Sequence, residues 1–317
     1  MHESNRPLVF GEALVDAFAD GMVPGGAPFN VACHLAALGL SPVLLSRVGD
    51  DAAGAVLRDA AMRCGLSLDA VQADRATAQV VVHEGPAGHA FEIPDAQAFD
   101  RIDAEAAIAA ARQAAEGGWL YFGTLALRAD ASRQALAAVR ATRRHRAYVD
   151  LNWRAAGPAP AGILALLREI AVLKLSEEEL VRLLGWLGMS GSWGMPAVGD
   201  RDGGIAALCE RTGTRTLLVT HGADGAVAWD AGGRCTARVA APTLSALVDT
   251  VGAGDAFSGM MLAGLARGHA AEAVLEHAVA FASASCGWRG ALPADPSAYA
   301  TWRTTLASLD HRTGDAP

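Results

Sequence analysis

Short apolar runs alternate along the chain with stretches of apolar residues at helical spacing. Residues 7–16 predict a first strand that meets a glycine and continues to an acid, and residues 43–48 predict a second, buried strand. Each is followed by a turn and a helix, the first helix closed by Gly39 and the second by Gly65. Repeated strand, turn and helix units with short loops favour a mostly parallel sheet covered by helices.

Residues 79–83 and 90–93 interrupt this alternation. They predict two short strands joined by a turn that contains glycine and proline, which is typical of a hairpin. A hairpin without a helix of its own is an appendage to the main sheet. We therefore expect a small β-sheet lid, formed by about residues 13–28 and 76–99 and inserted in a single domain that spans residues 1–317.

The alternation returns after Asp103. The alanine-rich residues 104–115 have high helix propensity and predict a helix, whereas the glycine-rich residues 190–204 predict a loop. Further strands are expected at residues 119–122, 147–150, 170–175, 216–220 and 226–229. The pattern as a whole predicts an α/β fold with a central, mostly parallel sheet flanked by helices.

The composition narrows the class of protein. A chain of 317 residues that is 52% hydrophobic buries a large core, and a net charge of −8 argues against nucleic acid, which requires a basic face. The apolar residues 270–288 include Glu272, Glu276 and His277, so they predict a buried helix and no membrane span. The first residues lack the apolar segment of a signal peptide. We expect a cytoplasmic protein.

The five cysteines form no C-x-x-C pair, so they support neither a disulfide framework nor a zinc site, and we expect each to be a small core residue. Lys174 is the single lysine of the sequence. A G-x-x-x-x-G-K-[ST] phosphate-binding loop is therefore excluded, and any phosphate ligand needs other local donors.

Residues 248–260 carry the first candidate chemistry. Gly252 and Gly254 precede Asp255, which falls in the first turn of an apolar helix. Glycines let backbone N–H groups converge on a ligand, and a helix N-terminus attracts anions. A carboxylate inside such an anion cradle suits the removal of a proton from a hydroxyl that attacks a phosphate. The alternative is an acid that merely complements the helix dipole.

Polar groups also follow several predicted strands, where an open α/β sheet binds ligands. Two glycines precede the helix that carries Asn30, whose amide both donates and accepts hydrogen bonds, as a polyol ligand requires. Each candidate has a plainer alternative. Without a role in binding, Asn30 and Arg154 would be ordinary surface residues. Ser176 and Glu179 also fit an S-x-x-E capping box, and residues 220–225 also fit a hairpin turn.

Seven motifs occur in order along nearly the whole chain, at residues 11–16, 25–32, 47–51, 150–154, 174–179, 220–225 and 249–257. With them the chain resembles the ribokinase-like (PfkB) carbohydrate kinases, and within these the fructokinases. Two positions depart from the usual pattern. Ser176 stands where many members have asparagine, and the bulky Trp153 stands before Arg154.

The resemblance implies a role for each candidate. Asp255 resembles the general base that deprotonates a sugar hydroxyl, and the N–H groups of Gly252, Ala253 and Gly254 resemble an anion hole for the transferred phosphoryl group. The residues implied for the sugar are Asp16, Gly25, Gly26, Asn30 and Arg154. Those implied for ATP are Lys174, Ser176, Thr220, Gly222 and Gly225. Those implied for cations are Glu179 for Mg²⁺ through water, and Asp249 and Val251 for a monovalent cation such as K⁺.

The resemblance therefore implies a kinase that converts D-fructose and ATP to fructose 6-phosphate. Within the class, 2-keto-3-deoxygluconate, ribose or a nucleoside are alternative substrates. Alternatives of other classes are a nicotinamide oxidoreductase, although Phe257 replaces the last glycine of G-x-G-x-x-G, and a sugar-binding regulator without catalysis. Such kinases often form homodimers through the lid, for which the apolar residues 80–82 offer a strand edge.

Overall fold

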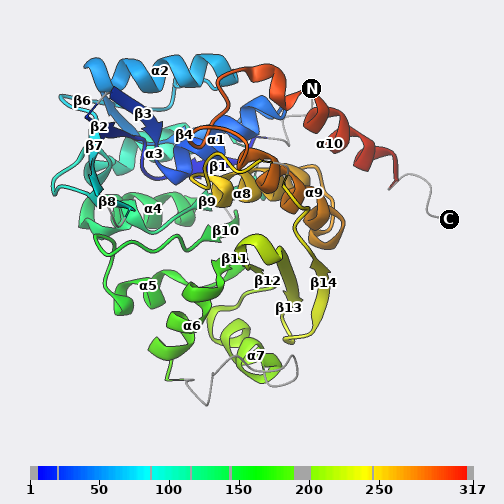
Figure 1. Ribbon diagram of the computed structural model, residues 1–317. Helices are drawn as coiled ribbons and strands as arrows, with labels where there is room; N and C mark the ends of the chain where they lie inside the picture. The colour runs from blue at the N-terminus through cyan, green and yellow to red at the C-terminus, as the bar shows by residue number, and fades with distance from the viewer. Residues whose placement is uncertain are drawn as a thin grey trace.

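The centre of the molecule is a sheet of short, mostly buried strands (Figure 1). The computed structural model describes residues 6–19, 21–85, 88–114, 116–142, 145–188, 201–244 and 246–312. Within them an eight-stranded sheet has the order β14-β13-β12-β11-β10-β9-β1-β4. Its strands are β1 (Leu8–Phe10), β4 (Val43–Leu45), β9 (Trp119–Phe122), β10 (Arg146–Asp150), β11 (Ile170–Ser176), β12 (Thr216–Thr220), β13 (Ala226–Asp230) and β14 (Cys235–Val239).

All pairings from β4 to β12 are parallel, and β13 and β14 extend the sheet in antiparallel fashion. The parallel strands are covered by helices on both faces, which is why they appear in the sequence as continuous apolar runs. Val9 and Tyr121 point into the core under α1, α8 and α9, whereas Leu8 and Phe10 point into the opposite core. The fold is therefore the predicted α/β class.

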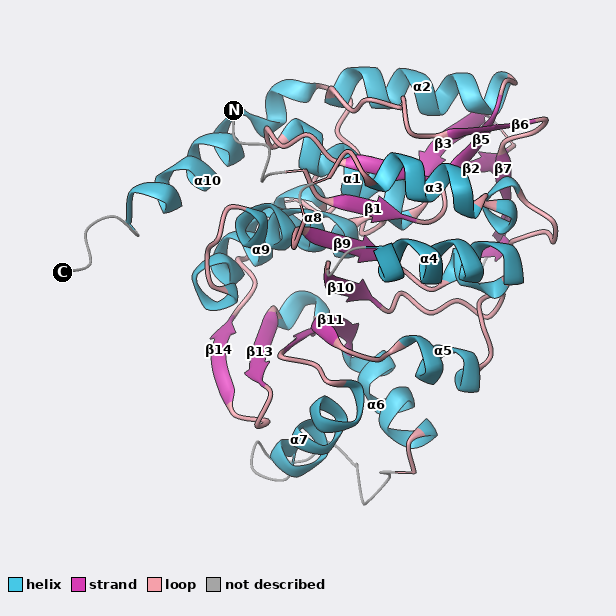
Figure 2. Cartoon of the chain, turned by 180° about the vertical axis from the view of Figure 1, so that it is seen from behind, coloured by secondary structure: helices cyan, strands magenta, loops and turns pink. Residues whose placement is uncertain are grey.

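The helices divide between the two faces of the sheet, and Figure 2 shows the α4 and α5 side. On the first face lie α1 (Ala27–Ala37), α2 (Ala52–Cys64), α8 (Ala253–Ala266), α9 (Ala271–Ser285) and α10 (Ala300–Arg312). On the second lie α3 (Ala104–Ala111), α4 (Asp130–Thr142), α5 (Pro160–Leu166), α6 (Glu177–Trp186) and α7 (Arg201–Thr212). None of the helices in the described ranges is both long and apolar enough to cross a bilayer.

A separate four-stranded sheet lies at one side of the large one (Figure 1). It has the order β3-β2-β7-β8 and contains β2 (Leu14–Phe18), β3 (Gly21–Gly25), β7 (Ala78–Gly85) and β8 (Gly88–Glu92). The antiparallel pairing of β7 with β8 confirms the predicted hairpin. Strands β2 and β3 hold Asp16 and Gly25, so the small sheet contributes directly to the candidate sugar site.

Two predicted strands are each divided between sheets. The run 7–16 breaks at Gly11, so that β1 belongs to the large sheet and β2 to the small one. Glycine is required at the break because φ is 145° and a Cβ would lie 2.5 Å from Cγ of Pro28. The run 43–48 breaks after β4, and β5 (Arg47–Gly49) pairs with β6 (Gln72–Asp74). Hydrophobic periodicity does not reveal a change of sheet, because both halves are buried.

Other predictions differ in extent. Helix α3 ends at Ala111, before the predicted end at residue 115, which lies outside the described residues. The predicted loop 190–204 is wrong at its end because α7 begins at Arg201, and residues 190–200 lie outside the described residues. Cys33, Cys64 and Cys209 are buried as expected, but Cys235 is exposed and Cys286 half-buried.

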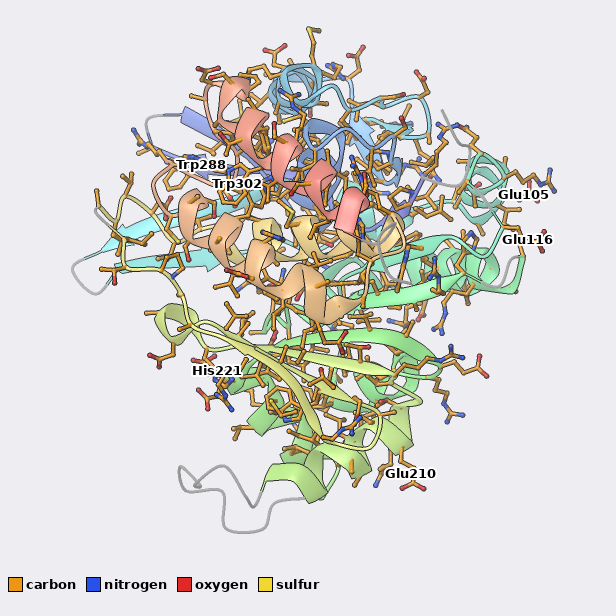
Figure 3. The ribbon with its side chains drawn as sticks, turned by 90° about the vertical axis from the view of Figure 1, so that its right-hand side faces the viewer. Glu105, Glu116, Glu210, His221, Trp288 and Trp302 are labelled. Atoms are coloured by element: carbon orange, nitrogen blue, oxygen red, sulfur yellow. The ribbon has the colours of Figure 1, made fainter. Side chains whose placement is uncertain are left out.

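Helix α10 was not predicted, and aromatic side chains hold it to the body of the protein. Trp302 lies 5.1 Å from Phe281 of α9 between ring centroids, and Trp288 lies 5.9 Å from the same ring (Figure 3). Burial of such large rings stabilises the attachment of the last helix.

Candidate active site

The turn before α8 forms the candidate anion cradle. Gly252 has φ 79°, and a Cβ there would lie 2.3 Å from Cβ of Ala291, so only glycine fits without displacement. Among the described residues, the N–H groups of Gly252 and Gly254 have no hydrogen-bond partner, whereas the N–H of Ala253 donates to the carbonyl of Thr250 at 3.3 Å. The cradle thus offers two uncommitted donors and a third engaged in a long hydrogen bond.

A buried ammonium lies directly behind this cradle. Nζ of Lys174 would be 3.1 Å from a Cβ on Gly254, and it forms an ion pair with both carboxylate oxygens of Asp150 at 3.0 and 3.1 Å. Burial opposes the charge of Lys174, but the nearby carboxylates of Asp150, Glu179 and Asp255 together outweigh it and raise the pKa of the ammonium. The hydroxyl of Ser258 completes the network by donating to Asp150 at 2.8 Å. The lysine therefore supplies fixed positive charge from beneath the turn.

Asp255 lies above the cradle in the first turn of α8 and is half-buried. Desolvation by burial raises the pKa of its carboxyl to about 6, against the opposing effect of a 2.8 Å hydrogen bond from Nδ2 of Asn30. The same amide leaves Oδ1 of Asn30 buried and without a partner among the described residues. This geometry gives a carboxylate that is ionised at neutral pH and still basic enough to accept a proton.

The small sheet supplies Asp16 and Gly25. Asp16 in β2 is half-buried, and burial raises the pKa of its carboxyl to about 6. A Cβ on Gly25 would lie 2.8 Å from Oδ2 of Asp16, and a Cβ on Gly26 would lie 2.6 Å from the carbonyl oxygen of Glu12. Exposed Arg154 lowers the pKa of both Asp16 and Asp255. The structure thus brings Gly25 to Asp16 and Asn30 to Asp255, and Arg154 acts on the charges of both carboxyls.

Trp153 turns away from this site. Its Nε1 donates to the carbonyl of Pro158 at 3.2 Å, its ring lies 5.5 Å from that of Trp186, and Arg182 stacks on it at 5.1 Å. The preceding residue, Asn152, has φ 39°, a backbone conformation that favours a sharp change of direction. The bulky departure in the motif therefore packs against α6 and leaves the sugar side open.

Glu179 ties two site segments together. The structure confirms the capping box, because Oγ of Ser176 accepts from the N–H of Glu179 at 3.2 Å and Oε2 of Glu179 accepts from the N–H of Ser176 at 2.8 Å. Oε1 accepts from the N–H of Trp153 at 2.7 Å. Burial raises the pKa of this carboxyl. No group of three acidic, histidine or cysteine side chains in the described ranges has the arrangement of a metal site.

The predicted ATP residues lie at the ends of neighbouring strands. Ser176 of β11 and Thr220 of β12 are register partners, and the Thr220 hydroxyl donates to the carbonyl of Leu175 at 3.3 Å. Gly222 and Gly225 have φ 57° and 95°, and a Cβ on Gly225 would lie 2.0 Å from the carbonyl oxygen of Val239. The hairpin alternative for residues 220–225 is thus confirmed, with β12 and β13 antiparallel.

Asp249 fixes the loop before the cradle. Its Oδ1 accepts from the N–H of Val251 at 3.0 Å and its Oδ2 from the N–H of Gly290 at 3.0 Å, while Val251 itself is 48% exposed. A bound monovalent cation at Asp249 and Val251 stays a prediction. What the structure adds is that this carboxylate joins two loops that surround Gly252.

Two features were missed in the sequence. The Asp150–Lys174–Ser258 network joins three distant segments, and no spacing rule predicts it. Glu12 belongs to the first motif but received no role, although it is 3% exposed and its carboxyl has a pKa raised to about 7 by burial. An acid directly after an apolar strand and a glycine was the available signal.

Comparison with known proteins shows the family. Residues 4–298 match the pfkB family carbohydrate kinase, so the chain belongs to the pfkB family of carbohydrate kinases. It is 34% identical to a fructokinase from Klebsiella pneumoniae over 81% of this chain and 83% of that one, and 32% identical to a fructokinase from Escherichia coli over 83% and 85%. The family leaves no place for the nicotinamide oxidoreductase alternative.

The solved structures agree on the fold. A fructokinase from Vibrio cholerae with bound fructose, ADP and calcium ion has a TM-score of 0.75 at 24% identity, covering 94% of this chain and 99% of that one. An aminoimidazole riboside kinase from Salmonella enterica has a TM-score of 0.72 at 24% identity, covering 95% and 99%. The ribokinase-like α/β fold is thereby established.

Proposed function

We propose that this protein is a fructokinase, which transfers the γ-phosphoryl group of ATP to the primary hydroxyl of D-fructose and releases fructose 6-phosphate and ADP. The observation that carries the proposal is the position of Asp255. It lies in the first turn of α8, directly after the N–H groups of Gly252 and Gly254, which have no partner among the described residues. Asn30 donates a hydrogen bond to its carboxylate at 2.8 Å, and the buried ammonium of Lys174 attracts its charge. The likeness to curated fructokinases supports the choice of sugar.

The chemical step uses these groups in sequence. A carboxylate oxygen of Asp255 accepts the proton of the sugar hydroxyl, and the hydroxyl oxygen forms a bond to the γ-phosphorus of ATP. The bond from that phosphorus to the bridging oxygen breaks, and its electron pair leaves with ADP. In this proposal the free N–H groups of Gly252 and Gly254 and the charge of Lys174 would offset the negative charge of the transferred group.

Mg²⁺ fits the nucleotide side of this site. Mg²⁺ prefers oxygen ligands and usually keeps several waters, and it would neutralise charge on the phosphates. Both oxygens of Glu179 already accept backbone hydrogen bonds, so this carboxylate suits contact through water. The proposed ATP site is bordered by Lys174, Ser176, Thr220, Gly222 and Gly225. The proposal also includes a K⁺ ion beside Asp249 and Val251.

The small sheet acts as a lid in this proposal. Asp16, Gly25 and Gly26 come from its strands β2 and β3 or from their junction with α1, so closure of the sheet would complete the sugar site. Excluding water protects ATP from hydrolysis and strengthens the electrostatic interactions in the site. A homodimer through the lid is part of the same proposal, and Val81 of β7 is 37% exposed there. Because the reaction consumes ATP, we place the protein in the cytoplasm.

A screen for ADP release tests the substrate. Purified protein is incubated with ATP, Mg²⁺ and, one at a time, D-fructose, ribose, 2-keto-3-deoxygluconate and aminoimidazole riboside. The last is included because the chain is 30% identical to an aminoimidazole riboside kinase from Salmonella typhimurium over 90% of its length. We expect the highest kcat/KM with D-fructose. Turnover of another compound without turnover of fructose contradicts the sugar, and no ATP consumption with any compound favours the regulator.

A further inference from the structure

Ser258 is a fully buried serine of α8 whose hydroxyl binds outside its own helix. A serine inside a helix usually donates to a backbone carbonyl of the preceding turn, as Ser285 of α9 does to Ala282 at 2.7 Å. The hydroxyl of Ser258 instead donates at 2.8 Å to Oδ2 of Asp150, 108 positions away at the end of β10. It also accepts from the hydroxyl of Tyr148 at 3.4 Å. A hydroxyl of α8 is thus committed to a buried carboxylate of the large sheet.

Asp150 in turn holds the ammonium of Lys174. Nζ lies 3.0 and 3.1 Å from the two carboxylate oxygens, and both residues are buried. An ammonium has three N–H groups, and these two contacts use at most two of them. At least one N–H therefore has no acceptor among the described residues. A buried donor needs an acceptor, so this N–H suits an anionic ligand that the protein itself does not supply.

This ion pair lies along one turn of α8. Gly254 and Ser258 are separated by one helical turn, so they lie on the same face of the helix. Nζ of Lys174 lies against the first, 3.1 Å from the place of a Cβ, and the carboxylate of Asp150 lies against the second. A movement of the carboxylate away from Ser258 would therefore also move the ammonium relative to the cradle at Gly254.

We propose that Ser258 is a positioning residue for phosphoryl transfer. It fixes the Asp150 carboxylate against α8, and this carboxylate holds the Lys174 ammonium beside Gly254 with an N–H free for the phosphates of ATP. The inference rests on the proposed function, which has the phosphates of ATP bind at the cradle. A positive charge stabilises the transferred group best when it is already in place before the reaction, because no rearrangement is then needed during the step.

The position of the ammonium can be followed directly, because Lys174 is the single lysine of the sequence. Protein grown with lysine that carries ¹³C at Cε gives the side-chain signal of this one residue, from the carbon bonded to Nζ. The probe is the non-hydrolysable ATP analogue AMP-PNP with Mg²⁺. In the wild type we expect the signal to shift when the analogue binds. In Ser258→Ala we expect a different signal position in the free protein and a smaller shift on adding the analogue.

Kinetics with whichever sugar the wild type phosphorylates give a second readout. Ser258→Ala should lower kcat by about tenfold, since members of one hydrogen-bond network are coupled by an amount of this order. The KM for the sugar should stay within about twofold, because the hydroxyl contacts Asp150 and Tyr148 and not the sugar side. In a Lys174→Met background the same substitution should change kcat little, because the charge that it positions is already gone. If the alanine variant folds poorly, Ser258→Cys keeps a weaker donor of similar size and should change kcat in the same direction.

Ser285→Ala is the matched control, because it removes the hydroxyl of another buried helical serine. It should change neither the lysine signal nor kcat, and an equal loss of kcat in this control would overturn the inference. The same holds if Ser258→Ala leaves the signal and its shift as in the wild type, or if it lowers kcat equally with and without Lys174. A wild-type signal that does not respond to AMP-PNP is a different result. It contradicts the ATP side of the proposed function, and the inference fails with it.

Discussion

Replacing Gly252 by alanine tests the cradle at the residue where it is most constrained. The added Cβ would lie 2.3 Å from Cβ and 2.5 Å from Cα of Ala291, and the residue would keep φ 79°. A left-handed conformation costs an alanine about 1–2 kcal/mol. Overpacking against backbone adds about 1–3 kcal/mol. We therefore expect the free energy of unfolding to fall by about 2–5 kcal/mol.

Activity should fall together with stability. Relief of the clash must move either the turn or Ala291, and the turn carries the N–H of Gly252 that is free for the phosphoryl group. Loss of one aligned donor of this kind lowers kcat by about 10²–10³-fold. ADP release gives kcat, and urea unfolding followed by circular dichroism gives the free energy.

Gly65→Ala is the matched control. Gly65 has φ 74° at the end of α2, and a Cβ there would meet nothing within 4 Å. This variant should lose only the backbone term of about 1–2 kcal/mol and keep normal kcat. Equal stability losses in both variants, or near-normal kcat in Gly252→Ala, would refute the account of the turn.

Three further variants follow from the same geometry. Asp255→Asn should lower kcat by about 10²–10⁴-fold, while calorimetry should still detect ATP binding. Because the pKa of Asp255 is raised to about 6 in the folded protein, the wild type loses stability as the pH rises from the ordinary aspartate pKa to about 6. This variant should therefore have a higher Tm than the wild type at pH 7.5, and an equal or lower Tm would contradict the expected sign. Lys174→Met leaves Asp150 buried without its ion pair and should lower the free energy of unfolding by about 3–5 kcal/mol, measured by denaturant titration. Adding Asp150→Asn to the same chain should partly restore that free energy, and no recovery would argue against the ion pair. Trp153→Ala removes packing against α6 and should cost about 1–3 kcal/mol with little change in KM for the sugar, whereas a large rise in KM would place the ring in the sugar site.

Local patterns predicted most of the fold. The caps of α2 at Asp51 and Gly65, the antiparallel hairpin of β7 and β8, and most strands of the large sheet follow from turn residues and apolar runs. The errors lie where one apolar run serves two sheets, as at Gly11, because periodicity records burial and not the identity of the neighbouring strand. Helix α10 was missed because its attachment depends on rings that come from α9 and the following loop.

The chemistry divides in the same way. The sequence alone determined that the chain resembles a known family and that its anion cradle is not a P-loop. These conclusions need only the glycines before Asp255, the capping box at Ser176 and the absence of a second lysine. The pairing of Asn30 with Asp255 spans 225 positions, and Lys174 reaches Gly254 only because β11 lies beside β10 under α8. Strand order decided these contacts. Charges and donors act through space over a few ångströms, and only the tertiary structure sets that distance.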